Sequence, residues 1–82
     1  MTKIKICGIT NALDAIKCVE LGADALGFIF AKSRRQVTKE KAREIIEKLP
    51  PFISKVGVFV DEKEDVVREI QSYCGLTALQ FH

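Results

Sequence analysis

Several patterns are missing from this 82-residue chain, and each absence excludes a class of protein. No apolar run approaches the ~18 residues that a membrane helix needs. The N-terminal residues lack the apolar stretch and cleavage site of a signal peptide. The chain has one histidine, His82, and three cysteines without a CxxC pair, which argues against a zinc site. The phosphate-binding fingerprints GxGxxG and Walker A are absent as well.

The charge is nearly balanced, with 13 basic and 11 acidic residues and a formal net charge of +2. This balance gives no reason to expect a nucleic-acid or membrane partner. Hydrophobic residues make up 48% and charged residues 29% of the chain, as in an ordinary globular protein. An odd number of unpaired cysteines fits a reducing cytoplasm, which is the expected location.

The chain alternates between two kinds of segment. Residues 3–9, 24–30, 54–60 and 76–81 are short, apolar and rich in β-branched or aromatic residues, and we expect them to be strands. The second and third contain the nearly continuous apolar runs ALGFIF and VGVFV. Strands that are buried on both faces have this composition, and such strands are typical of parallel sheets.

Helical patterns lie between these strands. Asn11 and Thr38 are suited to cap the first two helices, and Asp61 with Glu64 resembles a capping box for the third. The residues expected to end the three helices are Gly22, Pro50-Pro51 and Gly75. The expected apolar stripes are Ala12, Ala15, Ile16 and Val19; Ala42, Ile45, Ile46 and Leu49; and Val66, Val67, Ile70 and Tyr73.

The resulting order, β-α-β-α-β-α-β, predicts an α/β fold with right-handed crossovers and a parallel sheet. The chain stops after a fourth strand whose apolar edge nothing covers, so we expect a piece of something larger. We predict that residues 1–82 are the N-terminal part of a single (β/α)8 TIM-barrel domain, which typically runs ~250 residues. On the pattern alone, a doubly wound sheet remains open.

The alternation of side chains along the first predicted strand places Cys7 on the face where active-site residues are expected. Ile4 and Ile6 point toward the helices, whereas Lys3, Lys5 and Cys7 point toward the barrel axis. Cys7 is therefore a thiol at the active end of the first strand, and a nearby cation favours a thiolate. The alternative is that Cys7 simply packs. Lys5 is either a member of a structural ion pair or a catalytic residue.

The segment AKSRRQ at 31–36 is short, polar and cationic. It is either a solvated loop or an anion clamp, in which Arg34 or Arg35 would hold a carboxylate or phosphate. His82 shares its parity with Ala78 and Gln80, so it either lines the site or is merely the last residue of the chain. Cys18 and Cys74, on helices, are expected to be structural or surface thiols.

Four motifs together resemble one family. KICGIT at 5–10, GADALGFIFAKSRR at 22–35, VGVFV at 56–60 and LQFH at 79–82 are similar, in order and spacing, to the phosphoribosylanthranilate isomerases. These are TIM-barrel enzymes of tryptophan biosynthesis. The resemblance implies an Amadori rearrangement of N-(5′-phosphoribosyl)anthranilate to 1-(o-carboxyphenylamino)-1-deoxyribulose 5-phosphate, with no cofactor.

The resemblance also implies roles for individual residues. Cys7 would be the general base that takes the proton from C2′, and an ordinary thiol pKa of about 8.5 is within reach of neutral pH. Arg35 would hold the anthranilate carboxylate. Arg34 could share or take over that role, because the loop lacks a Pro that is common before Lys32. His82 is included among the predicted substrate-binding residues.

Other parts of the family's site lie outside these 82 residues. The general acid is an aspartate on a later strand, and the phosphate-binding loops follow the seventh and eighth strands. We assign neither role to Asp24 or Asp61. The expected partners are a phosphorylated small molecule and the remaining part of the barrel, and the isolated 82-residue piece is expected to be inactive.

Two other interpretations stay open at this point. One is another phosphate-binding biosynthetic barrel such as an indole-glycerol-phosphate synthase, although such enzymes usually place lysines at strand ends, whereas this first strand ends in Cys7. The other is a non-catalytic half-barrel module that associates with itself.

Overall fold

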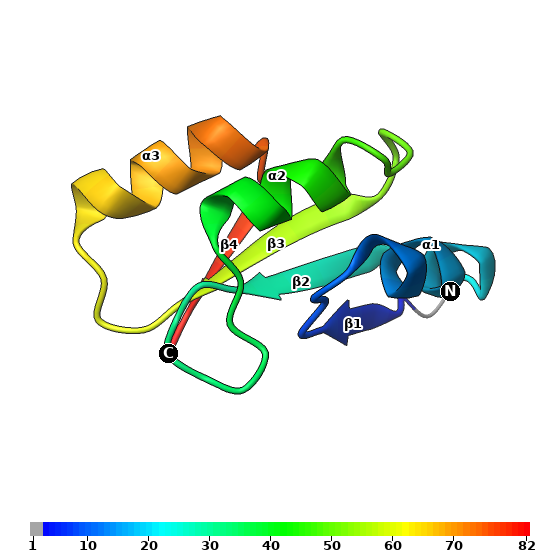
Figure 1. The fold of residues 1–82 in the computed structure, drawn as a ribbon, viewed down its shortest axis with the longest axis horizontal. Coiled ribbons are helices and arrows are strands. Elements are labelled where there is room, and N and C mark those ends of the chain that lie inside the picture. The colour runs from blue at the N-terminus through cyan, green and yellow to red at the C-terminus, as the bar shows by residue number, and fades with distance from the viewer. Residues whose placement is uncertain (1–2) are drawn as a thin grey trace.

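The computed structural model describes residues 3–82 as alternating strands and helices (Figure 1). The strands are β1 (Lys5–Cys7), β2 (Ala25–Ile29), β3 (Ser54–Phe59) and β4 (Ala78–Phe81). The helices are α1 (Ala12–Glu20), α2 (Lys39–Ile46) and α3 (Glu64–Cys74). The predicted order is confirmed. β1 is shorter than the predicted first strand, residues 3–9. It ends at Cys7 because Gly8, with a φ of 90°, leaves the extended conformation.

The four strands form one parallel sheet in the order β1-β2-β3-β4. In register, Cys7 lies opposite Gly27, Gly27 opposite Val56, and Val56 opposite Ala78. Strands that are consecutive in the chain are therefore neighbours in the sheet, and the strand arrows in Figure 1 run the same way. A doubly wound sheet reverses its strand order and carries helices on both faces, so the structure favours the opening part of a barrel.

All three helices pack on one face of the sheet, here called the outer face. One hydrophobic core joins Leu26 and Phe28 of β2 and Phe59 of β3 to residues of all three helices. The helix residues buried in it are Ala15 of α1, Ala42, Ile45 and Ile46 of α2, and Val67 and Cys74 of α3. Leu26 and Phe28 are fully buried, and such burial contributes about 1.5–3 kcal/mol for each side chain.

Local capping signals fix most helix ends as predicted. Asn11 Oδ1 accepts a hydrogen bond from the Asp14 backbone N–H at 2.8 Å. Thr38 Oγ1 accepts one from the Lys41 N–H at 3.1 Å. Gly22 follows α1 with a φ of 101° and Gly75 follows α3 with a φ of 75°, as expected for the left-handed residue after a helix.

The predicted capping box at Asp61 is wrong. The residue that precedes α3 is Lys63, which makes no side-chain capping hydrogen bond. Asp61 instead lies between β3 and α3 with a φ of 50°, which is not the extended backbone conformation of an N-cap residue. Glu64 and Asp65 lie in the first turn of α3, where their negative charges interact favourably with the positive end of the helix dipole.

All three predicted apolar stripes are also corrected. Tyr73 of α3 is 36% exposed, whereas its neighbour Cys74 is buried in the core. Ile16 of α1 is 39% exposed, whereas Cys18 packs against the core. α2 ends at Ile46, before Pro50, and Leu49 packs against the core from the turn that follows the helix. Helical periodicity gives the side of a helix that is buried but not how far a neighbouring element extends over it.

The opposite face of the sheet, here called the inner face, carries the alternate side chains of each strand. Its members, aligned by register, are Lys5, Cys7, Ala25, Gly27, Ile29, Ser54, Val56, Val58, Ala78 and Gln80. Lys5 on β1 donates a hydrogen bond from Nζ to Gln80 Oε1 on β4, although these strands are the two edges of the sheet. The sheet is therefore curved around its inner face, as the wall of a barrel is.

Candidate functional site

Cys7 is the last residue of β1 and carries an exposed thiol on the inner face. Its Sγ lies above Gly27 of the neighbouring strand, because a Cβ added to Gly27 would be 2.9 Å from that sulfur. A side chain at position 27 would therefore compete with the thiol for space. Cys7 is not enclosed by packing in residues 3–82, and its thiol is accessible to a ligand.

Arg35 lies beside Cys7, across the loop that follows β1. A Cβ added to Gly8 would be 2.6 Å from Arg35 Cδ and 3.1 Å from its Nη1. Gly8 therefore satisfies two requirements, since it adopts a φ of 90° and leaves room for the arginine stem. The structure brings Cys7 and Arg35, which the sequence singled out separately, to one rim of the sheet.

The loop that carries Arg35 is tied back to the end of β2. Val37 donates its backbone N–H to Ile29 O at 2.9 Å, and the Gln36 amide donates to Phe30 O at 3.2 Å. Within the loop, the Arg35 N–H donates to Ser33 Oγ at 3.1 Å. Arg34 is exposed in the same turn, but the side chain that lies over Gly8 is that of Arg35.

A cleft of about 370 Å³ lies between β1 and α1, at the edge of the described sheet, and both Cys7 and Arg35 are among the residues that line it. The residues lining it are Ile6, Cys7, Gly8, Ile9, Thr10, Asp14, Lys17, Cys18, Leu21 and Arg35. A thiol and a guanidinium at one rim could bind an anionic substrate and react with it. The guanidinium offers planar paired donors for a carboxylate or phosphate, and the thiol offers a nucleophile or, as a thiolate, a base.

His82 belongs to a separate polar chain on the inner face. The Gln80 amide nitrogen, Nε2, lies 2.8 Å from His82 Nε2, and the Gln80 amide oxygen accepts from Lys5. The His82 backbone N–H donates to Phe59 O at 3.1 Å, which fixes the main chain at this point. Lys5 thus has an amide partner in residues 3–82 rather than the carboxylate expected of an ion pair.

The other two cysteines are placed differently from Cys7. Cys74 is only 4% exposed, and its Sγ donates to Lys39 O at 3.2 Å. Burial raises the pKa of the Cys74 thiol and so favours its neutral form. Cys18 is half-buried against the core. Cys74 is therefore a structural thiol, as the sequence allowed.

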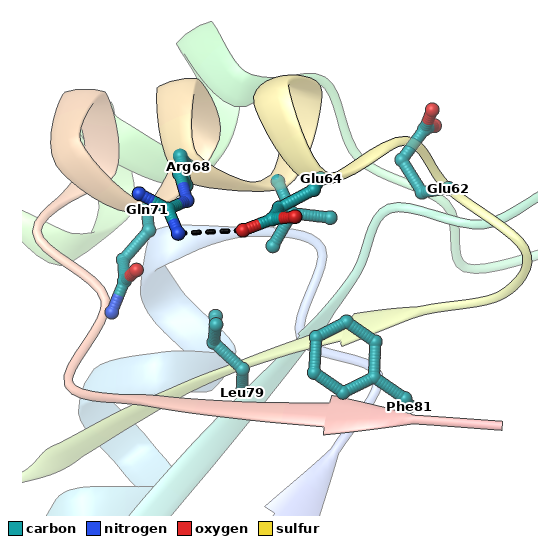
Figure 2. Close-up of a pocket in the computed structure, with 7 residues that line it drawn as sticks. Glu62, Glu64, Arg68, Gln71, Leu79 and Phe81 are labelled. Atoms are coloured by element: carbon teal, nitrogen blue, oxygen red, sulfur yellow. Dashed lines mark hydrogen bonds and ion pairs between the residues drawn. The ribbon is translucent and has the colours of Figure 1, made fainter.

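A second and larger groove, of about 480 Å³, lies on the outer face between α3 and β4 (Figure 2). Leu79 and Phe81 of β4 form its apolar floor, and Arg68 on the rim makes an ion pair with Glu64, with Nη2 and Oε1 2.5 Å apart. The groove is on the opposite side of the sheet from Cys7 and Gln80. It is consequently a packing surface distinct from the strand-end site.

The remaining candidate groups have structural roles. Asp24 Oδ2 accepts from the Ile4 backbone N–H at 2.8 Å, near the start of β1 and away from the Cys7 rim. Among residues 3–82, no group of three or more His, Cys, Asp or Glu side chains is placed to hold a metal ion. No helix in that range combines the length and apolar character needed to cross a membrane.

Sequence reasoning missed the two glycines that shape the site. Gly8 and Gly27 sit beneath Arg35 and Cys7, and their importance depends on contacts between distant segments. Gln80 was visible as an inner-face residue by strand parity. Its link to Lys5, 75 residues away, follows from the curvature of the sheet, which periodicity does not reveal.

Comparison with known proteins identifies the family. The family model described as N-(5′-phosphoribosyl)anthranilate isomerase matches residues 4–82. The isomerase of Desulforudis audaxviator is 55% identical over 82 residues, which are all of this chain and 40% of that protein. That of Thermotoga neapolitana is also 55% identical, over 83 residues that cover this whole chain and 40% of the relative. This chain thus spans about 40% of the curated relatives it matches.

Solved structures agree with this assignment. A phosphoribosylanthranilate isomerase in complex with reduced 1-(o-carboxyphenylamino)-1-deoxyribulose 5-phosphate matches all of this chain over 43% of its own, with 51% identity and a TM-score of 0.98. The Thermotoga maritima isomerase matches over 40% of its chain with the same identity and TM-score. The chain therefore belongs to the N-(5′-phosphoribosyl)anthranilate isomerase family.

Proposed function

We propose that the complete protein carrying this chain converts N-(5′-phosphoribosyl)anthranilate to 1-(o-carboxyphenylamino)-1-deoxyribulose 5-phosphate, an Amadori rearrangement in tryptophan biosynthesis. The observation that carries the proposal is the meeting of Cys7 and Arg35 at one rim of a sheet that superposes on isomerase structures. The alternative of indole-glycerol-phosphate synthase loses its support, because the family model and the curated relatives are isomerases.

Cys7 is the proposed general base. Once the ribose ring opens to a Schiff base, a thiolate at Cys7 takes the proton from C2′, and the resulting enolamine tautomerises to the aminoketose. The exposure of the thiol and its place at a strand end support this role. General acid–base catalysis of this kind contributes typically about 10²–10⁴-fold to a rate.

Arg35 is the proposed ligand for the anthranilate carboxylate. Its stem crosses Gly8, the residue after Cys7, so a carboxylate held by the guanidinium would lie close to the thiol. Paired N–H donors favour a planar carboxylate and fix its orientation as well as its position. Arg34 and His82 are proposed as secondary substrate contacts from the same strand-end region.

The remaining part of the barrel is the proposed partner of this chain. It would supply the aspartate that acts as general acid and the loops that bind the substrate phosphate. The outer-face groove over β4 supports this inference, because Leu79 and Phe81 form an apolar surface that the next helical layer would cover. A reducing cytoplasm remains the proposed location, supported by three free thiols.

The direct test supplies the complete protein with N-(5′-phosphoribosyl)anthranilate in deuterated water and follows the reaction by proton NMR. Conversion should replace the aminoaldose spectrum by that of the aminoketose, with loss of the C2′ proton to solvent. Absence of conversion by a folded, complete protein would refute the proposed activity.

A further inference from the structure

The Lys5, Gln80 and His82 side chains form one hydrogen-bonded chain on the inner face. Lys5 Nζ meets Gln80 Oε1, and Gln80 Nε2 lies 2.8 Å from His82 Nε2. Gln80 is half-buried between the other two, which hold its amide from both sides. The donor and acceptor chemistry of these three side chains therefore determines which group donates in each hydrogen bond.

Each link in the chain permits one arrangement of protons. A lysine ammonium has three donors and no acceptor, so the Gln80 atom that faces Lys5 is the amide oxygen. The amide nitrogen then faces His82, and an amide NH₂ donates and does not accept. His82 Nε2 must accept this hydrogen bond, and it must carry no proton to do so. In the neutral ring, the proton then belongs to Nδ1.

We propose that Gln80 is a positioning residue. Its amide oxygen accepts from Lys5, so its amide nitrogen donates to His82 Nε2 and holds the His82 ring in the Nδ1–H tautomer. The second ring nitrogen is then a donor and is the one left for a ligand. Within the proposed isomerase, on which this consequence rests, His82 binds a substrate oxygen through Nδ1–H and is not a second base beside Cys7.

The tautomer can be read from the ring nitrogens themselves. The complete enzyme is labelled with ¹⁵N-histidine and its ring signals are recorded over a pH series, so that the neutral ring is recognised by one protonated and one unprotonated nitrogen. The His82 signals are assigned by their loss in His82→Asn. We expect an unprotonated, pyridine-type Nε2 and a protonated, pyrrole-type Nδ1.

Gln80→Glu reverses the polarity with little change in shape. A carboxylate accepts from both neighbours, so His82 Nε2 should become protonated and its signal should change to the pyrrole type. Gln71→Glu adds the same charge on α3 and should leave the His82 signals unchanged.

A protonated Nε2 in the wild-type enzyme would overturn the proposal, as would an Nε2 that stays unprotonated in a folded Gln80→Glu variant. If Gln80→Glu does not fold, the wild-type spectrum alone decides. The measurement uses no substrate, so its outcome is independent of whether the enzyme proves to be an isomerase.

Discussion

The stem of Arg35 crosses Gly8 so closely that a Cβ at position 8 would lie 2.6 Å from Arg35 Cδ. The guanidinium therefore reaches the Cys7 rim only because position 8 has no side chain. Gly8→Ala should displace Arg35 and raise KM for the substrate. It should also cost about 1–2 kcal/mol of stability, because alanine at a φ of 90° is strained.

Gly22 provides the matched control for this prediction. It has a φ of 101°, but a Cβ added there would meet no atom within 4 Å. Gly22→Ala should lower the melting temperature in a similar way and leave KM unchanged. Steady-state kinetics and thermal denaturation of the two variants of the complete enzyme check both effects. An equal KM in both variants would show that Gly8 matters only for the backbone.

The two adjacent arginines should differ in their effect on substrate binding. Arg35→Ala should raise KM roughly 10- to 100-fold, the range expected when a charged hydrogen-bonding partner worth about 1.5–3 kcal/mol is lost. Arg34→Ala should have a smaller effect, since Arg35 is the side chain that lies over Gly8. If KM for Arg34→Ala rises more than that for Arg35→Ala, the assignment of the carboxylate contact is off by one residue.

The three thiols should react at different rates. Cys7 is exposed, whereas Cys74 is 4% exposed and its pKa is raised by burial. Alkylation of the native complete enzyme with iodoacetamide should therefore modify Cys7 before Cys74, as peptide mass spectrometry can establish. Bound substrate should protect Cys7. Faster modification of Cys74 than of Cys7 in the folded enzyme would contradict the placement of both residues.

The 82-residue chain by itself should have no isomerase activity and should not form a stable monomer. Phe81 is 62% exposed on the outer face, and β1 and β4 leave free edges in the described sheet. Co-expression with the remaining part of the barrel should restore activity, as an assay of the two pieces separately and together would reveal. A cooperatively melting monomer in ultracentrifugation would contradict this prediction and favour an independent module.

Local sequence signals predicted the elements well, because their causes are local. Asn11 and Thr38 cap their helices through hydrogen bonds that span three residues. The Asp61 prediction failed although its spacing to Glu64 resembles a capping box. The path of the chain after β3 gives Asp61 a φ of 50°, and that path depends on tertiary structure.

The site was only partly predictable. Strand parity placed Cys7 on the inner face, but it left packing and catalysis open, and the proposed role came from the family resemblance. The contact between Gly8 and Arg35 depends on how the loop after β2 folds back. The link from Lys5 to Gln80 depends on the curvature of the whole sheet, to which every strand contributes.

The central claim is that Cys7 is the base, and the kcat of Cys7→Ala in the complete enzyme tests it most directly. We predict a loss of at least about 10²-fold with little change in folding, and a similarly poor Cys7→Ser, because a serine hydroxyl is too weak an acid to supply an anionic base near neutrality. Cys74→Ala, which removes a buried structural thiol, should keep its kcat per folded molecule. Turnover near wild type in a folded Cys7→Ala enzyme would contradict the account.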